Sequence, residues 1–413
     1  MLVALQFIAV LLLTAPWMRS ADSARYLALA KNLSAGFFSP DGTTPEAVWA
    51  PGYPAILAAL HYGAGLHLAV VVFLQLALVG AAIALAARTL DRTARLFFLM
   101  LCAGYPMIAL YSSAVMSEAV ATAGLTTLAI WLLRQPSVGH LIAAGATCGL
   151  LTMVRPDLAL LPFLIAAYLV LTRRWKEAVL PILAAAAVLT PYAVWNAVTF
   201  GKPSPLPVAS AVGSSLYLAT WQGKLPPSDL NALYQQEATP MAEASGLARE
   251  VRSVNESVGA PPLHPPWNPF LYPSALQSDV NSRLLALAVS RIQNDPLSYA
   301  KHVVRNLWAL WNTSSYPPQV PAPIAWILAV SSAIIFVLAL GGAWLTRRTF
   351  LPYVTFYLAG VHLLLHTEAR YTAPSRILLL MLAAVALERV LRLPYFSRLQ
   401  GPFALRSGLD AFR

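Results

Sequence analysis

Long apolar stretches, separated by short polar segments, follow one another along most of the chain. An α-helix needs roughly 20 apolar residues to cross a bilayer, and several of these stretches approach that length. The expected spans, with approximate ends, lie near residues 2–18, 66–87, 96–113, 117–133, 140–154, 158–172, 178–198, 321–345, 350–367 and 373–391. Because proline interrupts the hydrogen-bond ladder of a helix, the Arg155-Pro156 junction leaves 140–172 as either two short spans or one re-entrant unit.

Composition agrees with this pattern. Of the 413 residues, 58% are hydrophobic and only 11% are charged, and the mean hydropathy is +0.63. Soluble domains carry about 25% charged residues, so we predict an all-α polytopic membrane protein with about ten transmembrane helices. The net charge of +11 is expected of cytoplasmic loops that face anionic lipid, and it does not indicate nucleic-acid binding. Cys102 and Cys148 lie in apolar runs and are expected to be unpaired core residues.

The distribution of charge predicts the orientation. With the N-terminus inside, the inner side receives 14 of the 28 basic residues but only four of the 17 acidic ones. The positive-inside rule then places both termini in the cytoplasm. We expect the protein to lie in the cytoplasmic (inner) membrane. We expect the first segment to stay as an anchor and not to be cleaved as a signal peptide.

Two sizeable outer segments follow from this orientation, about 19–65 and 199–320. The second contains two helix-like stretches, VNSRLLALAVSRIQNDP and LSYAKHVVRNLWALWN, and the latter mixes Lys301, His302 and Arg305 with Trp308 and Trp311 as an interfacial amphipathic helix does. We predict a catalytic transmembrane module at 1–198, a large periplasmic loop at 199–320, and C-terminal helices with a basic tail at 321–413. Because the inner loops are short, the functional surface is expected on the outer face.

The stretch ADSARYLALAKNLSAG, at residues 21–36, places charged side chains directly after the first apolar segment. Asp22, Arg25, Tyr26 and Leu29 are spaced i, i+3, i+4 and i+7, which puts them on one face of a helix. The helix dipole favours a carboxylate at an N-terminus, where Asp22 can act as a general base. Arg25 can bind a phosphate or hold Asp22. The simpler interpretation is an interfacial helix with solvated charges.

Polar residues also mark the ends of other apolar runs. Tyr53 lies in a Pro-Gly-Tyr-Pro turn that begins a helix. Glu118 follows Ser117 at a predicted outer boundary, where an ionisable residue is a candidate functional group. An equally good interpretation is a first-turn carboxylate of a helix that Ser117 caps. We interpret the Arg155–Asp157 pair as structural.

The stretch HLLLHTEARYTAPSRILLL, at residues 362–380, crowds polar residues into a short outer hairpin: His366, Glu368, Arg370 and Tyr371. A guanidinium group binds phosphate oxygens with two parallel hydrogen bonds, and a phenol adds a donor. Arg370 and Tyr371 are therefore candidates for binding a lipid phosphate, the alternative being an arginine that snorkels from a helix end. The sequence has no recognisable metal motif and no P-loop, so ATP is not expected to drive the chemistry.

In chain order these motifs are Asp22-x-x-Arg25-Tyr26, Pro51-Gly-Tyr-Pro, Ser117-Glu118, Arg155-Pro156, a long outer loop and Arg370-Tyr371-x-x-Pro. This order resembles the GT-C class of integral-membrane glycosyltransferases, in the bacterial branch related to protein O-mannosyltransferases and lipid A aminoarabinose transferases. The resemblance covers about residues 1–395 and implies the GT-C fold. It also implies inverting transfer of a sugar, at the outer face, from a polyprenyl-phosphate donor to a hydroxyl group of a lipid, glycan or protein.

The resemblance also implies roles for single residues. Asp22 matches the general base, Glu118 a catalytic contact to acceptor or sugar, and Arg25, Arg370 and Tyr371 the groups near the donor phosphate. Further candidate substrate contacts are Tyr26, Tyr53, His366 and Glu368.

The chain departs from many members of this class at two places. It has Asp22-Ser23 where they have Asp-Glu, and Trp49-Ala50 where some have a metal-binding Glu and a phosphate-binding Lys. We therefore assign no cofactor from the sequence. A divalent metal would need other ligands, such as Asp41 and Glu46.

Two non-enzymatic alternatives stay open, a transporter of lipid-linked sugars or glycans and an assembly scaffold. A transporter usually places charged sites at mid-membrane between repeated halves, whereas this sequence shows no repeat and gathers its polar motifs at predicted outer boundaries. The enzyme hypothesis requires that Asp22, Arg25, Glu118, Arg370 and Tyr371 converge on one site.

Overall fold

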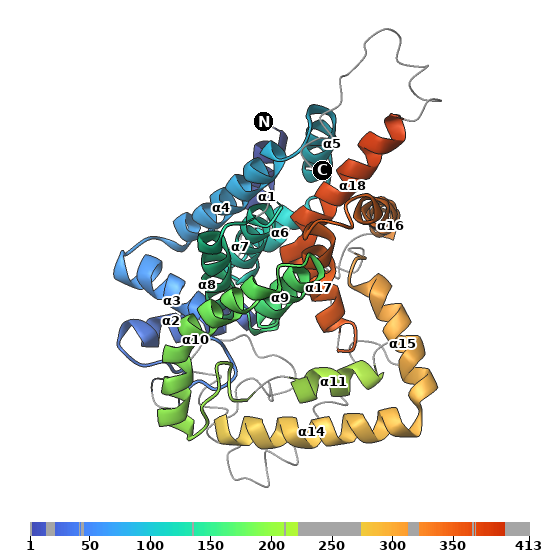
Figure 1. Cartoon of the computed structure of the whole chain (residues 1–413). Coiled ribbons are helices and arrows are strands. Elements are labelled where there is room, and N and C mark those ends of the chain that lie inside the picture. Colours follow the sequence, from blue (N-terminus) through green and yellow to red (C-terminus); the bar gives the residue numbers. More distant parts are fainter. Residues whose placement is uncertain are drawn as a thin grey trace.

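The computed structural model describes residues 2–13, 21–40, 42, 45–133, 136–209, 212–221, 274–312, 322–365, 367 and 369–392. Every regular element in these ranges is a helix (Figure 1), which confirms the predicted all-α class. The helices are α1 (Leu2–Leu13), α2 (Ala21–Ser34), α3 (Gly52–Leu57), η1 (Ala58–Gly63), α4 (Leu68–Arg88), α5 (Arg92–Gly104), α6 (Met107–Ser112), α7 (Glu118–Trp131), α8 (Val138–Val154), η2 (Pro156–Leu158), α9 (Leu161–Leu171), η3 (Trp175–Glu177), α10 (Val179–Phe200), α11 (Val212–Trp221), α14 (Ser274–Asn294), α15 (Pro296–Ala309), α16 (Ala322–Leu345), α17 (Leu351–His362), η5 (Ala369–Ser375) and α18 (Arg376–Leu391).

Each of the ten expected spans coincides with a helix, except that Tyr105 and Pro106 divide the third into α5 and α6. Among the described residues, three helices are long and apolar enough to cross a membrane: Leu68–Arg88, Trp175–Phe200 and Trp326–Leu345. The chain is therefore a multi-pass membrane protein. The remaining expected spans form shorter helices where they are described.

The junction between the fifth and sixth expected spans separates two helices. The α8 helix ends at Val154, Pro156 begins the short helix η2, and α9 starts at Leu161. Arg155 itself is extended, as a residue before proline prefers. The break places Arg155 and Asp157 at a helix end inside the bundle, where their side chains can reach neighbouring helices.

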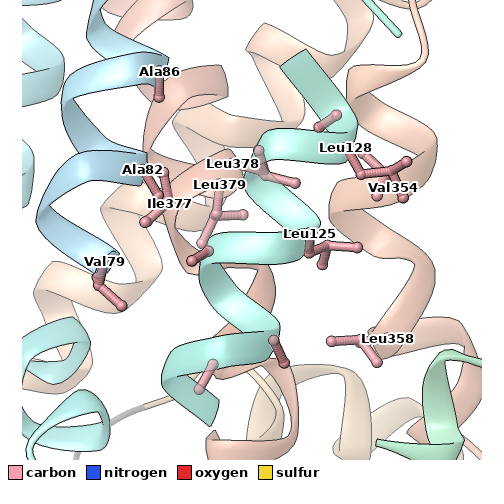
Figure 2. Close-up of a cluster of buried hydrophobic side chains, with 14 of the residues drawn as sticks. Val79, Ala82, Ala86, Leu125, Leu128, Val354, Leu358, Ile377, Leu378 and Leu379 are labelled. Atoms are coloured by element: carbon pink, nitrogen blue, oxygen red, sulfur yellow. The ribbon is translucent and has the colours of Figure 1, made fainter. Parts of the chain in front are cut away.

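The core lies where α4, α7, α17 and α18 meet (Figure 2). The α18 helix is buried along most of its length, and its Ile377, Leu378 and Leu379 pack between Leu125 and Leu128 of α7 and the small side chains of α4. Cys102 and Cys148 are buried and unpaired, as expected. This packing fixes η5, which directly precedes α18.

Three helices of the predicted outer loop, α11, α14 and α15, lie together at one end of the molecule (Figure 1). Residues 210–211, 222–273 and 313–320 of that loop lie outside the described residues. The α15 helix has an exposed apolar side with Leu297 and Val304, but Trp311 is fully buried. Trp311 packs 4.9 Å from the Arg376 guanidinium because the chain turns inward after α15, so it is not an interfacial anchor.

Two hydrogen bonds attach α15 to the segment that leads to η5. Tyr299 donates its hydroxyl hydrogen to the Leu364 carbonyl at 2.5 Å. Asn306 donates to the carbonyls of Leu363 and Leu365. The α15 helix is thus fixed to the part of the chain that carries Arg370. The three-part domain division stays a prediction.

Candidate functional site

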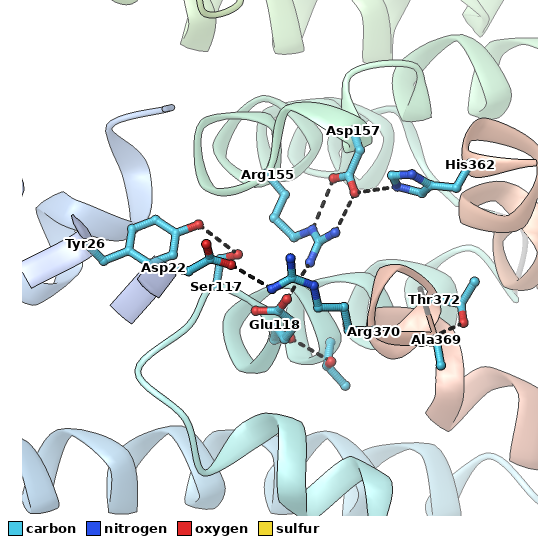
Figure 3. A network of polar contacts seen from close by, with 11 residues as sticks. Asp22, Tyr26, Ser117, Glu118, Arg155, Asp157, His362, Ala369, Arg370 and Thr372 are labelled. Carbon is cyan, nitrogen blue, oxygen red and sulfur yellow. Dashed lines mark hydrogen bonds and ion pairs between the residues drawn. The ribbon is translucent and has the colours of Figure 1, made fainter. Parts of the chain in front are cut away.

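The first polar motif forms α2, and Asp22 stands in its first turn as the sequence predicted. Asp22 Oδ2 accepts a hydrogen bond of 2.6 Å from Arg370 Nη1 in η5 (Figure 3). These side chains are 28% and 25% exposed. The motif at the start of the chain and the motif near its end therefore meet at a place that a ligand can reach.

Tyr26 lies one turn after Asp22 and is buried. Its ring packs edge-on against Trp49 and Tyr53, at 4.4 and 4.7 Å between centroids. Its hydroxyl donates to Ser117 Oγ at 3.3 Å. Burial, reinforced by the nearby Glu118 carboxylate, raises the pKa of the Tyr26 phenol well above its usual value. Tyr26 is therefore a neutral donor that ties α2 to the start of α7.

Arg25 points to a different partner from the one expected. It is buried and donates to Glu46 Oε2 at 2.6 Å, while Glu46 Oε1 accepts from the backbone amides of Val48 and Trp49. The long arginine side chain reaches the 45–49 loop even though its Cα shares a helix face with Asp22. Its Nε and Nη1 are buried without a hydrogen-bond partner among the described residues, so phosphate binding by Arg25 stays a prediction.

Glu118 is the first residue of α7 and is buried. Its Oε1 lies 3.2 Å from Arg155 Nη1, and Arg155 also donates two hydrogen bonds to Asp157, at 3.1 and 2.6 Å. Asp157 Oδ2 lies 3.0 Å from His362 Nε2 of α17 (Figure 3). Two carboxylates therefore share one buried guanidinium.

Aromatic contacts connect this arrangement to Arg370. The Tyr371 ring stacks on the His362 ring at 4.6 Å, with 15° between the planes. The Arg370 guanidinium lies 5.5 Å from the centre of the Tyr371 ring. We call Asp22, Glu118, Arg155, Asp157, His362, Arg370 and Tyr371 the polar network.

The polar network includes four of the five residues whose convergence the enzyme hypothesis requires. Arg25 stands beside it on α2 and faces Glu46. Tyr53 is fully buried and donates a hydrogen bond of 2.6 Å to Gln75 Oε1. Its ring packs against Tyr26, so it supports Tyr26 and is not part of the polar network. The expectation that Ser117 caps α7 is wrong, because its side chain forms no cap hydrogen bond. His366, Glu368 and Asp41 lie outside the described residues.

Metal ligands do not gather in the described part of the chain, which contains no group of three or more His, Cys, Asp or Glu residues able to hold an ion. Glu46, which the sequence offered as a replacement ligand, instead pairs with Arg25. No metal is assigned to the polar network.

Three members of the polar network, Arg155, Asp157 and His362, were not predicted as site residues. Asp157 was interpreted as a structural partner of Arg155, which it is, but the pair also reaches Glu118 and His362. His362 precedes Arg370 by eight residues of sequence and was not singled out. The sequence signal that could have identified them is their position. Arg155, Asp157 and His362 are ionisable and lie at the ends of apolar runs, and such groups must find partners inside the bundle.

Comparisons with known proteins give distant structural likenesses. No protein-family model matches the sequence, and no curated protein matches it. ArnT from Cupriavidus metallidurans, solved with bound undecaprenyl phosphate, is 15% identical with a TM-score of 0.41, over 93% of this chain and 76% of ArnT. The oligosaccharyltransferase AglB from Archaeoglobus fulgidus, solved with an inhibitory peptide and a dolichol-phosphate, is 14% identical with a TM-score of 0.47, over 98% of this chain and 52% of AglB. The arabinosyltransferase EmbB from Mycobacterium smegmatis is 17% identical with a TM-score of 0.32, over 94% of this chain and 41% of EmbB.

Proposed function

We propose that the protein is an inverting glycosyltransferase of the GT-C class, which moves a sugar from a polyprenyl-phosphate donor to a hydroxyl acceptor at the outer face of the cytoplasmic membrane. The support is the order of the sequence motifs and the meeting of Asp22 with Arg370 across 348 residues of sequence. A carboxylate and an arginine, both about one-quarter exposed, supply a base and a phosphate ligand side by side.

Asp22 is proposed as the general base. It would accept the proton of the acceptor hydroxyl while that oxygen forms a bond to the anomeric carbon of the sugar. The carbon–oxygen bond to the donor phosphate breaks on the opposite side, so the configuration at that carbon inverts. The first turn of α2 favours the carboxylate form through the helix dipole.

Arg370 is proposed to bind the donor phosphate, which leaves with the bonding electron pair. A guanidinium at the phosphate stabilises the charge that develops on the leaving oxygen, and such electrostatic stabilisation is usually a large part of catalysis. Tyr371 stacks on His362 and lies beside the Arg370 guanidinium. Asp22 pairs with Arg370, so an arriving phosphate would take over this guanidinium and release the base.

Glu118 is proposed to contact the sugar or the acceptor. Its Oε2 is buried and has no hydrogen-bond partner among the described residues. An unused carboxylate oxygen close to the Asp22–Arg370 pair suits a sugar hydroxyl, which donates a hydrogen bond to it. Arg155 holds the other oxygen in place.

The test is transfer of radiolabelled sugar by purified protein, with a panel of polyprenyl-phosphate sugars as donors and membrane extract as acceptor. Wild-type protein should transfer label from at least one donor, and Asp22→Asn, which keeps the shape but removes the base, should not. Glu177→Gln is the matched control, because Glu177 also pairs with an arginine but lies outside the polar network. Equal activity of wild type and Asp22→Asn would remove Asp22 from the mechanism, and an absence of transfer with every donor would contradict the enzyme hypothesis.

A further inference from the structure

A cavity of about 270 Å³ lies apart from the polar network, where α14 ends and α15 begins. The ends of α11 and α14 and the first two turns of α15 form its walls, and Figure 1 shows these helices together at one end of the molecule. Sites for small molecules usually measure about 300–1,000 Å³. The cavity therefore suits one small unit of a ligand and is too small for a lipid chain.

The lining of this cavity combines polar groups with apolar surface from Ile292 and the Tyr299 ring. It presents the hydroxyls of Thr220 and Ser298, the Asn294 amide, the Asp295 carboxylate and the Arg291 guanidinium. Donors and acceptors of both charge signs thus stand around a small volume. An anion would meet Asp295 and a cation would meet Arg291, so neither charge is favoured.

Neighbouring contacts hold these groups in place. The Arg291 guanidinium lies 3.2 Å from the centre of the Trp221 ring and 5.8 Å from that of Tyr217. The α11 and α14 helices are packed closely, since Ser214 N donates to Asn281 Oδ1 at 3.0 Å. The wall formed by α11 and α14 is therefore preorganised, which lowers the entropy cost of binding.

Among the described residues, Asp295 accepts a hydrogen bond through only one of its carboxylate oxygens. Its Oδ1 accepts a hydrogen bond from Ser298 N at 3.0 Å and so caps α15. Its Oδ2 remains available for a ligand hydroxyl. Tyr299 is fixed by the hydrogen bond from its hydroxyl to Leu364, so its ring offers a flat wall to the cavity.

We propose that this cavity binds one sugar unit of a glycan acceptor. Sugar hydroxyls both donate and accept hydrogen bonds, which matches alternating carboxylate, amide, hydroxyl and guanidinium groups. An apolar peptide side chain would meet Ile292 and the Tyr299 ring but could not form hydrogen bonds with Asn294 or Asp295. This inference rests on the proposed glycosyltransferase function and names the class of its acceptor.

The α15 helix, whose first turns line the cavity, is also joined at its C-terminal end to η5. Thr372 and Arg376 donate hydrogen bonds to the Leu310 carbonyl, directly after α15, at 2.6 and 2.7 Å. The same short segment, η5, carries Arg370. A glycan held in the cavity would thus bind to an element that is rigidly joined to Arg370.

The test compares transfer to membrane extract that is untreated, oxidised with periodate to cleave vicinal diols, or digested with protease. The variant is Asp295→Asn combined with Asn294→Ala, since asparagine keeps the cap of α15. The control is Lys301→Gln, which lies on the same helix outside the cavity lining. The amount of extract that gives half-maximal transfer should rise roughly tenfold in the variant, as loss of hydrogen bonds to a charged group predicts, with the donor KM and the control unchanged.

A second measurement is independent of the variant. Acceptor extract should slow the amide hydrogen exchange of residues 291–302 in wild-type protein, and periodate-treated extract should not. Transfer that survives periodate but not protease would overturn the proposal, as would an unchanged acceptor requirement in the variant or no exchange protection at 291–302. If wild-type protein transfers no sugar at all, the proposed function itself fails, and that result is distinct from each of these.

Discussion

Asp22 Oδ2 and Arg370 Nη1 lie 2.6 Å apart, so the proposed base and the proposed phosphate ligand neutralise each other before any substrate arrives. A donor phosphate must compete with Asp22 for this guanidinium. We predict that Asp22→Asn binds the donor more tightly than wild type, by up to roughly tenfold, because the competing charge is gone. Its transfer rate should nevertheless fall by roughly 10²–10⁴-fold, the usual contribution of a general base.

The measurement is donor affinity by fluorescence titration with a labelled polyprenyl phosphate, made alongside turnover on the same preparations. Glu177→Gln should change neither quantity. A parallel loss of donor affinity and turnover in Asp22→Asn would indicate that Asp22 binds substrate, and the competition with Arg370 would be refuted.

Arg370→Lys is expected to impair the enzyme although it keeps the charge. A lysine ammonium lacks the planar fork that binds two phosphate oxygens, and it cannot hold the same contact with Asp22. We predict a rise of roughly tenfold or more in the donor KM together with a fall in kcat, because Arg370 acts both on the bound phosphate and on the leaving group. Steady-state kinetics with varied donor would reveal this, and a variant with wild-type constants would exclude Arg370 as the phosphate ligand.

Much of the helix pattern and part of the site followed from the sequence. The ten apolar stretches all coincide with helices, and Asp22, Glu118 and Arg370 are in the polar network as expected. The partner of Arg25 did not follow, because a long side chain at i+3 can turn to a loop 21 residues away. Nor did the burial of Trp311, which depends on where Arg376 packs in three dimensions.

Arg155 is expected to be important for stability. It lies between Glu118 and Asp157, and the three side chains are nearly buried. Arg155→Gln would leave two carboxylates close together without a counter-charge, and removing one partner of a buried ion pair costs about 3–5 kcal/mol of unfolding free energy. Arg174→Gln, which breaks the more exposed pair with Glu177, should cost much less, because solvent screens an exposed ion pair.

Denaturant unfolding in detergent would compare the two arginine variants. Similar small losses for both would mean that Glu118 and Asp157 are not held by Arg155 in the way the geometry indicates.

Tyr26 gives a prediction about pH. Burial raises the pKa of its phenol, so the folded state binds this proton more tightly than the unfolded state, where the pKa is about 10. The resulting stabilisation is complete below about pH 10 and is lost as the pH rises through the folded-state pKa. The stability difference between wild type and Tyr26→Phe should therefore stay constant up to about pH 10 and shrink as the pH rises above that value.

The measurement is the unfolding free energy of both proteins at each pH. The other buried tyrosines are present in both, so the difference isolates Tyr26. The phenylalanine variant keeps the contacts with Trp49 and Tyr53 and loses the hydrogen bond to Ser117, which is worth about 1 kcal/mol. A difference that does not change with pH would contradict the proton linkage.

Two adjacent glycines in α16 provide a matched test of the packing that supports η5. A Cβ atom at Gly342 would overlap the Leu382 carbonyl of α18, whereas one at Gly341 would meet only the Ala386 methyl group at 3.7 Å. Gly342→Ala must push α16 and α18 apart, and overpacking of this kind costs typically about 1–3 kcal/mol. Gly341→Ala should be neutral or stabilise the protein by up to about 1 kcal/mol, because alanine favours the helix. Since α18 continues directly from η5, Gly342→Ala should also lower sugar transfer, and equal stability and activity of the two variants would show that α16 and α18 do not touch at Gly342.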